Sequence, residues 1–226
     1  ISQLLDAIKS GAIFALGEIH GVKENPNIIY TLIKKFSFKR LALEWEKSLE
    51  NGIEIFVKGG EIDYESIMKS SDGRITAGHF ALLRKLKEEN LTDFFLFDDS
   101  FHWEDRDQGM AKIIIEKTKD PNLPTIVVAG SAHTNMREIR EYDGKIHTSM
   151  VKELQNRGTK FVIGEIEYLS GKFFNNKIKN LGDEDVEGKS AKFYKNDEGL
   201  YVYELPLGTP ADVPNINQED YDEEYV

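Results

Sequence analysis

Two Gly-x-x-His motifs carry the side chains best suited to chemistry in this chain. They are GEIH at residues 17–20 and GSAH at residues 130–133, and each follows a short apolar run. An imidazole placed after a strand can move protons near neutral pH or bind a metal ion. We therefore take His20 and His133 as the first candidates for a functional site, because one such motif is a weak signal and two are a stronger one.

Two glutamates accompany these histidines. Glu18 lies within the first motif, and Glu44 lies inside the apolar run RLALEW at 40–45. A carboxylate in a buried strand is costly unless it is paired or functional. Alternation along the strand places Glu46 on the same face, but Glu46 is closer to the next helix, where a carboxylate complements the helix dipole. Glu44 is therefore the better site candidate.

Arg106 is the fifth candidate, in the segment EDRDQGMA that opens a predicted helix. Asp105 and Asp107 are interpreted as ordinary partners of the helix dipole, whereas a cation at this position is unfavourable unless it pairs with an acid or an anionic ligand. Arg106 is thus either half of a salt bridge or a clamp for an anion or oxyanion. His79 and His102 stand at helix starts, which favours capping.

Apolar runs alternate with helical patterns along most of the chain. Continuous apolarity predicts strands buried on both faces, and the alternation predicts an α/β fold with a mostly parallel central sheet and helices on both faces. In such sheets ligands bind at the carboxyl ends of the strands. The predicted strands cover 12–17, 40–45, 94–99, 125–130 and 160–169. The predicted helices cover 26–36, 79–89, 103–117 and 148–155.

These strand ends bring the candidate residues to one edge. Asp98, Asp99 and Ser131 also follow strands, and His147 could project to the same place. Glycine in each motif is expected to let the backbone turn sharply so that the histidine points back over the sheet. Asn25 is placed to cap the first of these helices, with Pro26 at its first position.

The chain as a whole divides into three parts by residue composition and pattern. Residues 1–169 form the predicted α/β domain, and 170–208 form an antiparallel β-hairpin appendage, with a turn at 195–199. Residues 209–226 are acidic and rich in residues that interrupt helices and strands, which predicts a mobile tail. The segment 57–78, with its glycine pairs, is a candidate lid over the site.

Composition excludes several classes of function. The 226 residues carry a formal net charge of -11, which argues against nucleic acid and anionic membranes as partners. The chain has no cysteine, so disulfides and thiolate metal sites are excluded. No apolar run approaches the roughly 20 residues of a membrane span. Localisation stays open between the cytoplasm and export with a leader removed. Phosphate-loop, dinucleotide and Gly-x-Ser-x-Gly motifs are absent.

Five motifs in order resemble one superfamily. They are LGEIHG, LALEWE, EDRDQGMA, VVAGSAH and TSMVKEL. This order resembles the superfamily that joins erythromycin esterases, ChaN-like haem-binding lipoproteins and the TIKI/TraB group. EDRDQGMA and TSMVKEL are most similar to the esterase branch. The spacing in GEIH is that of the ChaN and TIKI branches, since the esterase branch usually has one more residue between Glu and His.

The resemblance to the esterase branch implies a hydrolase. His20 would be the general base that takes a proton from water, and Glu18 or Glu44 would orient its imidazole. Water would attack an ester, lactone or amide carbonyl of a small-molecule or peptide substrate. His133 and Arg106 would then stabilise the oxyanion.

The other branches imply different uses of the same residues. A TIKI-like protein would bind a divalent metal through His20, Glu44 and His133, and would be a protease. A ChaN-like protein would bind haem through a tyrosine or histidine without catalysis. A domain that keeps the fold and has lost activity is the last alternative. The cofactor, divalent metal, haem or none, and the oligomeric state stay open from sequence.

Overall fold

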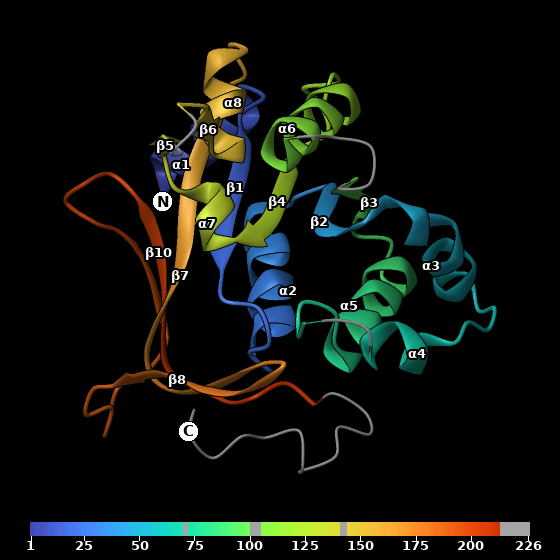
Figure 1. Ribbon diagram of the computed structural model, residues 1–226, viewed down its shortest axis with the longest axis vertical. Helices are drawn as coiled ribbons and strands as arrows, with labels where there is room; N and C mark the ends of the chain where they lie inside the picture. Colours follow the sequence, from blue (N-terminus) through green and yellow to red (C-terminus); the bar gives the residue numbers. More distant parts are fainter. Residues whose placement is uncertain (70–71, 100–104, 141–143, 213–226) are drawn as a thin grey trace.

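The centre of the molecule is an eight-stranded sheet, and a separate pair of strands lies beside it (Figure 1). The computed structural model describes residues 1–69, 72–99, 105–140 and 144–212. The strands are β1 (Ile13–Glu18), β2 (Arg40–Glu46), β3 (Asp93–Asp98), β4 (Thr125–Gly130), β5 (Glu138–Arg140), β6 (Ile146–Thr148), β7 (Phe161–Asn175), β8 (Lys177–Asp183), β9 (Lys192–Lys195) and β10 (Tyr201–Gly208).

The order of the sheet is β3-β2-β4-β1-β7-β10-β9, with β8 paired to β7. From β3 to β10 each neighbouring pair is parallel, whereas β9 and β8 run antiparallel to β10 and β7. The prediction of an α/β fold with a mostly parallel sheet and antiparallel C-terminal strands is therefore confirmed. All four apolar runs before residue 131 form strands of this sheet.

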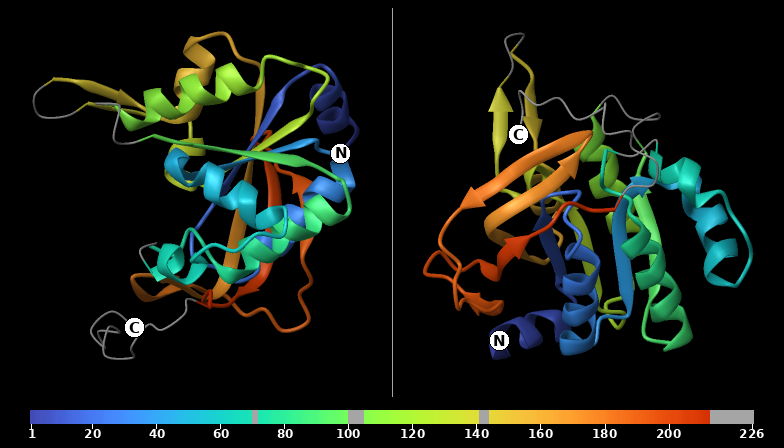
Figure 2. Two further views of the ribbon diagram at one scale, coloured as in Figure 1. Left: turned by 90° about the vertical axis from the view of Figure 1, so that its right-hand side faces the viewer. Right: turned by 90° about the horizontal axis from the view of Figure 1, so that it is seen from below.

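Helices cover both faces of the sheet, and one apolar core lies under each set (Figure 2). The larger core packs β-strand side chains such as Phe14 and Leu16 against α1, α2, α3 and α5, and the smaller one packs Ile13 and Ala15 against α6 and α8. The helices are α1 (Ser2–Lys9), α2 (Asn25–Phe36), the 3₁₀ turn η1 (Lys47–Leu49), α3 (Glu50–Val57), α4 (Tyr64–Lys69), α5 (Ala77–Glu88), α6 (Arg106–Lys117), α7 (Ser131–Thr134) and α8 (Met150–Asn156).

Alternate residues of β1 enter the two cores, which is why this strand is buried along its whole length. No helix in the described ranges is long and apolar enough to cross a membrane.

All four predicted helices begin at a different residue from the one expected, with α5 starting at Ala77 and α8 at Met150. Helix α2 begins one residue earlier, with Glu24 in the N-cap position. Asn25 is therefore not the cap, because its side chain donates instead to the carbonyl of Ile19 at 2.8 Å. Helix α6 begins at Arg106, and the side chain of Asp105 caps it by accepting from the Gln108 N–H at 3.1 Å.

The C-terminal part continues the sheet. Strand β10 joins it parallel to β7, and the far half of β7 bends across the lower end of the molecule to pair with β8 (Figure 1). Residues 209–212 reach the loop after β1, where Val22 and Pro210 form an isolated bridge. The remainder of the segment 209–226 lies outside the described residues, so the division at 169 and 208 and the mobile tail stay predictions.

Candidate active site

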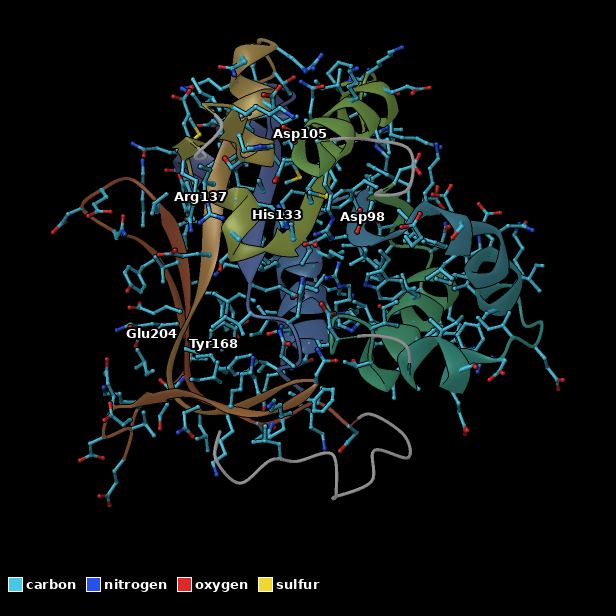
Figure 3. All side chains as sticks on the ribbon, viewed as in Figure 1. Asp98, Asp105, His133, Arg137, Tyr168 and Glu204 are labelled. Carbon is cyan, nitrogen blue, oxygen red and sulfur yellow. The ribbon has the colours of Figure 1, made fainter. Side chains whose placement is uncertain are left out.

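Four adjacent parallel strands bring the candidate side chains to one edge of the sheet. Glu18 ends β1, Glu44 lies near the end of β2, Asp98 ends β3 and Gly130 ends β4. His133 follows on α7, and Figure 3 labels it together with Asp98 at this edge. The edge is where open α/β sheets bind ligands. Glu18, His20, Glu44, Arg106 and His133 are all joined in one network there.

Glu44 is the centre of this network. Its side chain is 2% exposed, and β2 is irregular between Leu43 and Glu46, where its pairing with β3 shifts register. Its Oε1 accepts from Arg106 at 2.7 Å and from Arg74 at 3.0 Å, and its Oε2 accepts from the Gly130 N–H at 2.7 Å. Burial raises the pKa of Glu44, but His20, His133 and Arg74 outweigh it and hold the pKa well below its usual range. Glu44 is therefore a buried, permanently charged carboxylate.

His20 lies between two carboxylates. Its Nδ1 is 2.9 Å from Glu18 Oε1, and its Nε2 is 3.4 Å from Glu44 Oε2. Burial acts to lower the pKa of His20, but the hydrogen bonds to Glu18 and Glu44 raise it to about 10. For Glu18 itself burial dominates and raises the pKa, and its Oε2 is buried without a hydrogen-bond partner in the described structure. This pair holds a proton firmly.

His133 has the same arrangement on the other side of Glu44. Its Nδ1 is 2.5 Å from Asp107 Oδ1, and its Nε2 is 3.5 Å from Glu44 Oε1. The same Asp107 oxygen accepts from the Met150 N–H at 2.9 Å, which ties the start of α8 to this pair. Asp107 is thus more than a partner of the helix dipole, and the sequence analysis missed this role.

Arg106 binds two acids. It contacts Asp98 through Nε at 3.1 Å and Nη2 at 2.6 Å, and the same Nη2 reaches Glu44. Burial acts to lower the pKa of Arg106, but Asp98 and Glu44 raise it further above its ordinary value. These ion pairs explain how a cation is tolerated at the start of α6, which was one of the two sequence readings. The oxyanion role of Arg106 stays a prediction.

Arg74 belongs to the site and was missed by sequence reasoning. Its guanidinium binds Asp72 at 2.8 and 2.6 Å, Glu44 at 3.0 Å and, more weakly, Asp98 at 3.5 Å. It lies in the segment 57–78 that was expected to form a lid. The only signal in the sequence is the Asp-Gly-Arg triplet at 72–74, which is also common in ordinary turns. The lid itself stays a prediction.

The remaining histidines are peripheral to Glu44. His79 is 2% exposed on α5, its Nδ1 is 2.9 Å from Thr76 Oγ1, and its ring packs edge-on against Trp45. Thr76 holds the N-cap position of α5, so the capping role expected for His79 is wrong. Burial lowers the pKa of His79 to about 3, which makes it a neutral core residue. His147 Nδ1 is 3.5 Å from Asp105 Oδ2. His102 lies outside the described residues.

The glycines of the two motifs serve close packing, so the expected sharp turns are wrong. Neither Gly17 nor Gly130 has a positive φ angle. A Cβ atom on Gly17 would lie 2.3 Å from Thr134 Oγ1, and one on Gly130 would lie 3.2 Å from His20 Nε2. Glycine is favoured here because β1 touches α7 and His20 touches the end of β4.

The chemistry of the donor set does not fit a divalent metal. The metal reading needs His20, Glu44 and His133 as ligands, but Glu44 is bound to two guanidinium groups, whose charge would repel a cation. No group of three or more His, Asp or Glu side chains in the described ranges is arranged to hold an ion. Haem binding through a histidine or a tyrosine stays a prediction.

Comparison with known proteins identifies the fold. No family model and no curated protein sequence matches the chain. Among solved structures, a mutant of the erythromycin esterase EreC matches with a TM-score of 0.67 at 9% identity, covering 95% of both chains. The chain has the erythromycin-esterase fold.

Two further structures are similar. A protein described as a succinoglycan biosynthesis protein matches with a TM-score of 0.69 at 11% identity, over 93% of this chain and 91% of that one. The C-terminal region of Pasteurella multocida toxin, described as having a thiol-protease-like catalytic triad, matches with a TM-score of 0.54 at 12% identity. That match covers 96% of this chain and 28% of the toxin chain. At these identities the likeness concerns the fold alone.

Proposed function

We propose that this chain is a hydrolase that directs water at an ester, lactone or amide carbonyl. One observation carries the proposal: the Nε2 atoms of His20 and His133 face the two oxygens of Glu44, while each Nδ1 is held by a carboxylate of its own. Paired imidazoles with fixed orientation at a strand edge suit proton transfer. The erythromycin-esterase fold supports the same class.

In this proposal His20 is the general base. In a neutral His20 the proton lies on Nδ1, which donates a hydrogen bond to Glu18. The Nε2 atom then has a free lone pair that can accept a proton from water. Since the pKa of His20 is raised to about 10, only a small fraction of the protein is in this form at neutral pH. The rate should therefore rise with pH from 7 toward 10.

His133 is the proposed partner of the oxyanion. A protonated His133 would donate Nδ1–H to Asp107 and Nε2–H to the negative oxygen that forms when water adds to the carbonyl. Arg106 is the second candidate for this role, but its contacts with Asp98 and Glu44 favour holding the network in place.

A thiol mechanism like that named for the toxin region is not available to these residues, because the chain contains no cysteine. Nothing in the network corresponds to a covalent nucleophile either: no described serine contacts His20 or His133 in the hydrogen bonds of the site. Direct attack by water is the route that these side chains support.

The experiment is an assay of the purified chain against a panel of nitrophenyl esters, lactones and aryl amides between pH 6 and 10. His20→Ala should reduce turnover at least 1,000-fold, an order-of-magnitude expectation for loss of a general base that also orders the site. His147→Ala is the matched control and should stay within about threefold. A His20→Ala variant as fast as the parent contradicts the proposal. A parent chain inert on the whole panel would favour a fold that has lost its activity.

A further inference from the structure

Both backbone polar groups of Ile19, the residue between Glu18 and His20, are bound by side chains. The Ile19 N–H donates to the hydroxyl of Tyr168 at 3.2 Å, and its carbonyl accepts from Asn25 Nδ2 at 2.8 Å. The Tyr168 hydroxyl donates in turn to Asn25 Oδ1 at 2.8 Å. The three residues therefore form a closed ring of hydrogen bonds.

This ring replaces the sheet where the sheet ends. Strand β1 stops at Glu18, so Ile19 has no place in the ladder. A buried backbone group without a partner costs about as much as a lost hydrogen bond. Tyr168 comes from the neighbouring strand β7, where Figure 3 labels it, and Asn25 comes from the first turn of α2.

We propose that Tyr168 and Asn25 are positioning residues for the Glu18–His20 pair. The two side chains of the pair project from the residues on either side of Ile19, so the φ and ψ angles of Ile19 set the distance between them. Bonding the Ile19 N–H and C=O at once restrains both peptide planes that meet at its Cα atom. The 2.9 Å contact between His20 Nδ1 and Glu18 Oε1 depends on that restraint.

The buried amide of Asn25 and the buried hydroxyl of Tyr168 favour a role in positioning the Glu18–His20 pair. Asn25 is 1% exposed and Tyr168 is largely covered, and burying an amide or a hydroxyl is unfavourable unless it is bonded. Apolar residues of similar size would fill the same space without that cost. Burial, with the negative charge of Glu18 next in importance, also raises the pKa of Tyr168 well above its usual value. Tyr168 is therefore a neutral hydroxyl, able to accept from Ile19 and donate to Asn25 together.

The test measures the titration of His20 by NMR in the full chain. Tyr168→Phe removes the hydroxyl, and the proton affinity of His20 should fall at least tenfold, one pH unit, because Glu18 is no longer held against it. Tyr30→Phe is the matched control: its hydroxyl binds the surface carboxylate of Glu89, so His20 should titrate as in the parent. An unchanged His20 titration in folded Tyr168→Phe overturns the proposal.

A second variant covers loss of folding. If Tyr168→Phe does not give a cooperative thermal transition, Asn25→Ala is titrated in its place, and the same tenfold fall is expected, with an unchanged value again overturning the proposal.

The effect on turnover rests on the proposed function. In that case the pH at which kcat levels off should fall by about one unit in Tyr168→Phe, with KM within about twofold, since the change lowers the proton affinity of the base and leaves substrate contacts in place. The titration needs no substrate. If the pKa of His20 falls in Tyr168→Phe and the parent chain has no activity, the positioning role is supported and hydrolysis is not. If the parent chain is active and the pKa of His20 is unchanged in Tyr168→Phe, hydrolysis is supported and the positioning role is overturned.

Discussion

The two histidines of the site have nearly the same contacts and different surroundings. Nδ1 lies 2.9 Å from Glu18 in one pair and 2.5 Å from Asp107 in the other, and the Nε2 atoms lie 3.4 and 3.5 Å from Glu44. The Glu18 side chain is 3% exposed and has one oxygen without a partner, whereas Asp107 is 25% exposed and also accepts from a backbone N–H.

This difference in burial separates the chemistry of two similar pairs. A carboxylate that has lost its water depends on the imidazolium beside it, so the Glu18–His20 pair holds its proton to about pH 10. Solvent near Asp107 weakens the same attraction, because water screens the charge. The surroundings, more than the residue types, favour different roles for the two histidines.

Glu44→Gln should have the largest effect, because it removes the charge that both histidines share. We expect turnover to fall about 1,000-fold, as for loss of a central electrostatic group. Stability should fall by about 3 kcal/mol, since Arg74 and Arg106 lose one buried partner and keep Asp72 and Asp98. Steady-state kinetics and urea unfolding measure the two effects. Turnover within tenfold of the parent would remove Glu44 from the centre of the site.

Glu18→Gln and Asp107→Asn test the two pairs against each other. Glu18→Gln should lower kcat about 100-fold, because the neutral amide no longer favours the useful form of His20. Asp107→Asn should lower it only about tenfold, because water can take over part of its role. The ratio of the two kcat values is the measurement. If Asp107→Asn is the more damaging change, the roles are reversed and His133 is the general base.

The pH dependence of stability should report the Glu18–His20 pair. The folded-state pKa of His20 is raised from 6.5 to about 10, so its contribution is fully present below pH 6.5 and is lost as the pH rises toward 10. The difference in unfolding free energy between the parent and His20→Gln should amount to a few kcal/mol at pH 6 and shrink by pH 10. Urea unfolding of both chains across this pH range measures the difference. A difference that is constant with pH would contradict the raised pKa.

The strand ends could be predicted from sequence, because continuous apolar runs and parallel connections are strong signals. Both histidines, Glu18 and Glu44 therefore meet where they were expected. Glu44 was identifiable for a physical reason: a carboxylate inside an apolar run must be paired or functional.

The partners of these residues could not be predicted. Asp107 lies in the first turn of a helix, where the dipole favours an acid whichever way its side chain points. Arg74 lies in a loop without periodicity, and Tyr168 alternates like any strand residue. Their roles depend on contacts between elements distant in the chain, such as the 143 positions between Asn25 and Tyr168.

The smallest expected effect concerns the loop after His20, which is held by the segment that follows β10. Thr209 donates to Glu24 from its N–H at 2.9 Å and from its hydroxyl at 2.6 Å, and Ala211 donates to Gly21 at 2.8 Å. Thr209→Val removes only the hydroxyl bond, so stability should fall by about 1 kcal/mol.

Because the backbone bonds remain, kcat should fall by less than about threefold, with a small shift in the His20 titration and none for His133. Thr31→Val, which removes a hydroxyl bond on the exposed face of α2, is the control and should leave both histidines unchanged. Equal shifts at His20 and His133 in Thr209→Val would mean that the two pairs respond as one unit, and the contrast between them would then lie in burial alone.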